Sequence, residues 1–110
     1  MKFTTYVPTT DNNDRPFSAA LLERVIDQLW KPFKAMTDEG EVRGRWTNDL
    51  GVLRKDKSRK ISIDCSRDRL QEAIGAVKKA GRRLRQEAMY FEVAGYDGVQ
   101  ILKLEPRSRE

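Results

Sequence analysis

Apolar side chains recur along the chain with two different spacings, and the changes between them predict the order of its elements. Residues 2–7 are rich in β-branched and aromatic side chains, which is typical of a strand, and Pro8 ends it. From residue 19 to 31 apolar side chains recur every three to four positions, as in an amphipathic helix. Ser18 is the expected N-cap of that helix, and Pro32 should end it.

The second half of the chain repeats this order of spacings. A strand is expected around residues 42–46, followed by turn residues at 47–51 and an ambiguous basic segment at 52–60. Regular alternation at 59–65 predicts a strand, and residues 66–84 form the next helix, with Ser66 as its N-cap and Gly81 on its buried side. Strands at 88–93 and 99–104, joined by a tight turn, close the chain as a hairpin.

This order predicts an α+β fold of the ferredoxin-like type, β-α-β-β-α-β, with an extra strand from the C-terminal hairpin. Two amphipathic helices would cover one face of an antiparallel sheet and bury both apolar stripes at once. Residues 1–105 would form one domain and residues 106–110 a polar tail. The other face of the sheet would be polar, covered by a partner or used for binding.

Apolar side chains on both faces of several strands lead to an expectation about assembly. Phe3 and Tyr6 point to opposite faces, and so do Tyr90 and Phe91. A large uncovered apolar face is unusual in a monomer. We therefore expect a homodimer that buries this face.

The rarest residue types exclude several chemistries. The chain has no histidine and one cysteine among its 110 residues, which excludes Ser-His-Asp and Cys-His catalysis, histidine-based metal sites and an internal disulfide. We expect no metal and no cofactor, and we expect Cys65 to be a buried, unreactive thiol. With no segment of signal-peptide or membrane-spanning character, a cytoplasmic protein is expected.

A small group of polar and aromatic residues could line a pocket: Trp46, Gln86, Glu87 and Tyr90. A partly buried Glu87 would have a raised pKa and could act as an acid or base, and Trp46 could stack on a ligand. The alternatives are that Gln86 and Glu87 only satisfy backbone groups at a helix end, and that Trp46 lies in the core.

Basic residues concentrate in two segments, and the net charge is +5. The candidates for contact with nucleic acid or another anion are Arg54, Lys55, Lys57, Arg59, Lys78, Lys79, Arg82, Arg83 and Arg85. Against this reading, a charged helix face is also normal for solubility, and the strands lack the aromatic–glycine signature of RNA-recognition domains.

Four sequence features carry a resemblance: "YVPTTDN", "GRW", the later Asp56 and "QEAMYFEV". On these the chain resembles a group of small, uncharacterised bacterial proteins with the β-α-β-β-α-β order, which implies the fold and no particular activity. In layout it is also similar to dimeric α+β barrel proteins such as the cofactorless monooxygenases of antibiotic biosynthesis. Members of that superfamily often use a histidine or an Asn/Trp set in the pocket; this chain has Trp46 and no histidine.

The sequence leaves three alternative functions for this protein. The leading one is a non-enzymatic interaction module that forms a homodimer. The second is a small-molecule binding protein or cofactorless enzyme with its pocket near Trp46, Glu87 and Tyr90. The third is weak, non-specific nucleic-acid binding through the basic segments.

Overall fold

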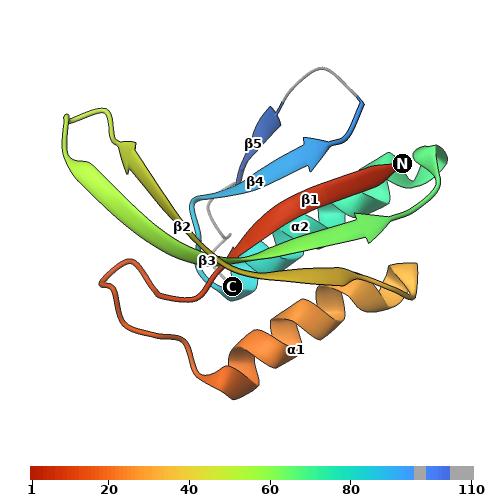
Figure 1. Cartoon of the computed structure of the whole chain (residues 1–110), viewed down its shortest axis with the longest axis horizontal. Coiled ribbons are helices and arrows are strands. Elements are labelled where there is room, and N and C mark those ends of the chain that lie inside the picture. The colour runs from red at the N-terminus through yellow and green to blue at the C-terminus, as the bar shows by residue number, and fades with distance from the viewer. Residues whose placement is uncertain (96–98, 105–110) are drawn as a thin grey trace, which may run out of the picture.

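The computed structural model describes residues 1–95 and 99–104 and contains two helices on one side of a five-stranded sheet (Figure 1). The strands are β1 (Lys2–Pro8), β2 (Thr37–Thr47), β3 (Leu53–Asp64), β4 (Ala88–Val93) and β5 (Val99–Lys103). The helices are α1 (Ala19–Trp30) and α2 (Leu70–Arg83), with short 3₁₀ helices at Lys31–Phe33 and Arg67–Arg69. The order of elements confirms the predicted ferredoxin-like fold.

The sheet is antiparallel throughout, in the order β2-β3-β1-β4-β5. The fifth strand pairs with β4 at one edge, as the closing hairpin predicts, although the predicted turn at 96–98 and the tail at 106–110 lie outside the described residues. The opposite edge is the long β2–β3 hairpin, whose far end extends beyond both helices (Figure 1).

The hydrophobic core lies between the helices and one face of the sheet. Alternate residues of the central strands point into it, and all of them are fully buried or nearly so: Phe3, Val7, Ile61, Ile63, Met89, Phe91 and Val93. The helices contribute their apolar stripes, among them Val25, Leu29 and Val77. This face is therefore the one that the alternation of the sequence assigned to the core.

Local signals in the sequence set several element ends. The Ser18 hydroxyl accepts a hydrogen bond from the Leu21 N–H at 3.1 Å and caps α1, and Pro32 stands where α1 gives way to a 3₁₀ turn. A Cβ on Gly81 would lie 2.6 Å from Met89 Cγ and 2.8 Å from Leu104 Cδ1. The missing side chain at Gly81 therefore lets α2 lie close against the β4–β5 hairpin.

Three sequence expectations need correction. β2 begins at Thr37, earlier than expected, and it pairs with β3, which begins at Leu53 and includes most of the segment 52–60 that the sequence left open. α2 begins at Leu70, since a 3₁₀ turn follows Ser66. Trp46 does not lie in the core: it is 51% exposed, because it pairs with Arg54 and so shares the face of Lys60, which points away from the helices.

Candidate functional site

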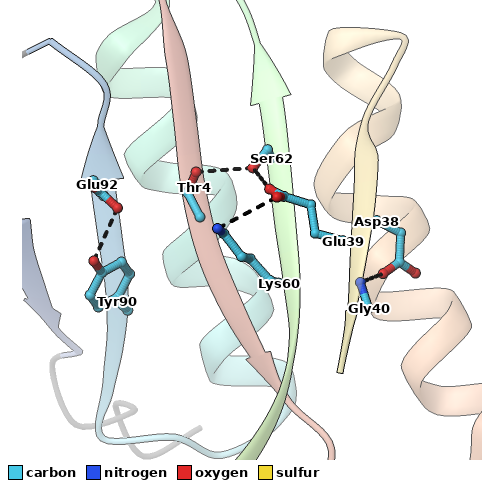
Figure 2. Close-up of polar contacts among 8 residues, drawn as sticks. All are labelled: Thr4, Asp38, Glu39, Gly40, Lys60, Ser62, Tyr90 and Glu92. Atoms are coloured by element: carbon cyan, nitrogen blue, oxygen red, sulfur yellow. Dashed lines mark hydrogen bonds and ion pairs between the residues drawn. The ribbon is translucent and has the colours of Figure 1, made fainter. Parts of the chain in front are cut away.

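The sheet face without helices carries two rows of mostly polar side chains. Residues directly opposite each other on paired strands share a face, so each row can be followed from strand to strand. One row contains Lys60, Tyr6, Tyr90 and Ile101, and the next contains Thr37, Ser62, Thr4, Glu92 and Val99. We use the name open-face cluster for Thr4, Tyr6, Glu39, Lys60, Ser62, Tyr90 and Glu92, most of which Figure 2 shows.

Two tyrosines from neighbouring strands form the aromatic part of the open-face cluster. The ring centroids of Tyr6 and Tyr90 are 4.5 Å apart, with the ring planes tilted by 32°. The Tyr90 hydroxyl donates a hydrogen bond of 3.1 Å to Glu92 Oε1 (Figure 2). Both rings are half-buried, so together they offer an accessible π surface beside a carboxylate.

The second carboxylate of the cluster belongs to Glu39, which lies at a β-bulge in β2. Asp38 pairs with Ile61 and Glu41 with Arg59, so Glu39 and Gly40 together oppose Lys60. Gly40 has a φ of +92°, which favours glycine, and its N–H donates to Asp38 Oδ1 at 2.9 Å.

At this bulge the Glu39 carboxylate joins a polar chain across the open face. Ser62 Oγ donates to Glu39 Oε2 at 2.5 Å and lies 3.1 Å from Thr4 Oγ1. Lys60 Nζ is 3.5 Å from Glu39 Oε1 (Figure 2). The bulged position thus adds a carboxylate to a row of hydroxyl groups from β1 and β3.

Charge at the cluster is set by these contacts. The hydrogen bond from Ser62, helped by Lys60 and Lys2, lowers the pKa of Glu39 despite some burial, so Glu39 is ionised at neutral pH. Burial, together with the hydrogen bond to Glu92, raises the pKa of Tyr90 to about 12, so its phenol keeps its proton. The cluster therefore combines anionic acceptors, a neutral phenol donor and the Lys60 ammonium around an aromatic surface.

Of the predicted pocket residues, only Tyr90 belongs to the open-face cluster. Gln86 Nε2 donates to the Leu84 carbonyl at 3.0 Å, and the Glu87 carbonyl accepts from the Leu104 N–H. Both residues therefore hydrogen-bond with backbone groups in the segment after α2. The Glu87 side chain is exposed, and Trp46 donates to Asp56 Oδ2 at 2.6 Å near the end of the β2–β3 hairpin. The structure does not gather these four residues into one site.

The predicted anion contacts separate into two places. Four of them line a hollow of about 360 Å³ at the end of α2: Lys79, Arg82, Arg83 and Arg85. Arg83 Nη1 there donates to Gln28 Oε1 at 2.7 Å, and Lys78, on the same helix, is half-buried. Arg54, Lys55 and Lys57 lie on the β2–β3 hairpin, where Arg59 pairs with Asp38.

The sequence alone did not identify most of the open-face cluster. Alternation placed Lys60 and Ser62 on the outward face of their strand, and Tyr90 and Glu92 together on theirs, which was the available signal. It gave no register between strands, so it did not predict the contact of Tyr6 with Tyr90. Glu39 was not singled out, because the bulge that carries it was not foreseen.

The remaining candidate chemistries are limited. Burial raises the pKa of the half-buried Cys65 thiol, which makes its thiolate scarce at neutral pH. Within residues 1–95 and 99–104, no three acidic or cysteine side chains gather as a metal-binding group would require. Neither helix of the described chain has the length and apolar character needed to cross a membrane.

Comparison with known proteins shows that the fold of this chain is similar to that of an enzyme. No family model matches the chain, and no curated protein matches its sequence. Among solved structures, a phage SAM lyase in complex with S-methyl-5'-thioadenosine aligns with a TM-score of 0.64 and 15% identity, over 97% of this chain and 92% of that one. A phage SAM lyase in its apo state aligns with a TM-score of 0.61, also at 15% identity, over 97% of this chain and 91% of that one. The chain thus shares its ferredoxin-like fold with an enzyme.

Proposed function

We propose that the chain binds S-adenosyl compounds at the open-face cluster and releases S-methyl-5'-thioadenosine from SAM. The observation that carries this proposal is the pairing of the Tyr6–Tyr90 rings with the carboxylates of Glu39 and Glu92 on the uncovered face. The fold relation to a lyase that holds S-methyl-5'-thioadenosine supports it.

The chemical groups of the ligand match those of the cluster. An adenine ring stacks on tyrosine, and such stacking is worth about 1–3 kcal/mol for a base. A sulfonium cation is stabilised by nearby carboxylates and by the faces of aromatic rings. Glu39 is held ionised by Ser62, and Lys60 offers an ammonium group to the carboxylate of the amino-acid end.

The proposed reaction suits a chain without histidine. When the bond from the sulfonium sulfur to the amino-acid carbon breaks, sulfur keeps the electron pair and leaves as the neutral thioether of S-methyl-5'-thioadenosine. No enzyme nucleophile is needed for that departure. The four-carbon fragment is completed by attack of its own carboxylate or by loss of a proton, and in the second case Glu39 or Glu92 supplies the base.

Turnover tests this function directly. Purified protein is incubated with SAM, and release of S-methyl-5'-thioadenosine is followed by mass spectrometry against a protein-free control. We expect release above the control, and we expect Glu39→Gln and Glu92→Gln to reduce it at least tenfold, while Asp56→Asn on the far hairpin leaves it unchanged. Release at the rate of the protein-free control, or an equal loss in Asp56→Asn, would contradict the proposal.

Self-association is a second proposal, and it rests on the exposed edge strand. Val99 is 46% and Ile101 59% exposed on β5, next to Glu92 and Tyr90 respectively. A homodimer that packs this side of the open face against a second copy would cover them and leave the 12.7 kDa chain in pairs. Light scattering at high micromolar concentration decides it, and a monomer mass across that range would contradict it.

A further inference from the structure

The β2–β3 hairpin changes character along its length. Near the body of the sheet its cations have acidic partners: Arg59 pairs with Asp38, and Lys60 with Glu39. Glu41 also lies directly opposite Arg59. This base of the hairpin is balanced in charge.

Farther out, cations face cations. Arg43 lies directly opposite Lys57, and Arg45 directly opposite Lys55. Residues opposite each other share a face, and positions two apart on a strand share it too, so these four side chains form one array. We use the name ribbon cations for Arg43, Arg45, Lys55 and Lys57. Across the strands their Cβ atoms are about 5 Å apart.

This arrangement is unfavourable in the isolated protein. All four ribbon cations are exposed, and in the described part of the chain none of their side chains has an ion pair or a hydrogen bond. Like charges directly opposite each other destabilise a strand pair, and here two such pairs are adjacent. The nearby Asp56 lies in the alternate register, opposite Gly44, and accepts from Trp46. An anionic partner would remove the repulsion.

The end of the hairpin adds apolar surface next to this charge. Leu50 is 87%, Leu53 56% and Val52 49% exposed. Exposed Asp49, however, lies in the turn beside Leu50, and burying a carboxylate in lipid is costly, so the end of the hairpin is poorly suited to enter a bilayer. A two-stranded ribbon fits the major groove of B-DNA, where its cations can meet the phosphates that flank the groove.

We propose that the outer half of the β2–β3 hairpin binds double-stranded DNA without sequence preference, with the ribbon cations on its phosphates. Its affinity at physiological salt would lie in the non-specific range of about 10⁻⁴–10⁻⁶ M. This surface is independent of the open-face cluster.

The test is fluorescence anisotropy of a labelled duplex of random sequence, titrated at 50 to 200 mM salt. Four phosphate contacts predict a slope of log K against log salt of about −3.6, which is a loss of about 150-fold over this range. The double variant Arg45→Gln/Lys55→Gln keeps two contacts, so its slope should fall to about −1.8. Its melting temperature should equal or exceed that of the wild type, because a like-charge pair is removed.

The matched control is Lys79→Gln/Arg82→Gln, which removes the same charge from the end of α2 and should keep the slope near −3.6. Equal weakening by both double variants would overturn the proposal, since net charge alone would then explain binding. A wild-type slope shallower than about −1 would also overturn it, as would strong binding to vesicles rich in anionic lipid without binding to the duplex.

Discussion

The two faces of the sheet are built from alternate residues of the same strands, yet they differ in almost every physical respect. On the covered face Phe3, Phe91 and Ile61 are fully buried among apolar neighbours. On the open face Tyr6, Tyr90 and Lys60 are half-buried and carry polar groups. The Tyr90 hydroxyl donates to a carboxylate, and the Lys60 ammonium pairs with another. The covered face holds the fold together, and the open face carries the polar and aromatic groups on which the proposed ligand site is based.

The largest expected effect comes from breaking the covered face. Phe91→Ala removes a fully buried ring that stacks on Phe3 at 5.5 Å, and should lower the free energy of unfolding by about 3–5 kcal/mol. Tyr90→Ala, one residue away on the open face, should cost about 1 kcal/mol. Urea denaturation of both variants measures the difference, and equal losses would contradict the division between the faces.

Two glycines of α2 differ in what lies beside them, so substituting each one tests how closely the helix packs against the covered face. Gly81→Ala would force a methyl group against Met89 and Leu104 and should cost about 1–3 kcal/mol. Gly75→Ala meets nothing within 4 Å and should stabilise the helix by up to about 1 kcal/mol. Thermal melting compares the pair, and a stabilising Gly81→Ala would show that α2 does not lie close against β4.

Alkaline pH should affect the open face through Tyr90. Its folded-state pKa of about 12 lies above the ordinary value of 10, so between these values the unfolded chain has lost a proton that the folded chain keeps. Stability should therefore fall as pH rises from about 10 to about 12. Tyr90→Phe should reduce this fall in melting temperature, and an unchanged fall would contradict the environment described for Tyr90.

Acid should have the smallest effect, through Glu39. Ser62 and Lys60 hold its pKa below the ordinary value of 4.5, so its contribution to stability is present above that value and is lost as pH falls through the lower folded pKa. Melting temperatures measured from pH 5 to pH 3 should fall less for Glu39→Gln than for the wild type. A steeper fall in the variant would contradict the contact with Ser62.

The fold could be predicted from the sequence because its signals are local. The alternation of Ile61 and Ile63, the helical stripe with Val25 and Leu29, and the Ser18 cap each depend on neighbours in the chain. Binary patterning of this kind decides which side chains face the core.

The site depends on information that such patterns do not contain. Tyr6 meets Tyr90 only through the register of β1 with β4, and Glu39 belongs to the cluster only through the bulge at Gly40. Trp46 was expected in the core or a pocket, and its exposure follows from a register that pairs it with Arg54 on the face away from the helices. Strand register and hairpin length are set by tertiary packing.

The measurement that tests the open-face proposal most directly is calorimetric titration of S-methyl-5'-thioadenosine into three proteins: the wild type, Tyr90→Ala and Trp46→Ala. Loss of a stacking ring should weaken binding by about 5- to 150-fold in Tyr90→Ala, since stacking is worth about 1–3 kcal/mol. Trp46→Ala, which removes an exposed ring from the far end of the hairpin, should bind as the wild type does. No binding by the wild type at millimolar ligand, or equal affinity in the wild type and Tyr90→Ala, would contradict the account.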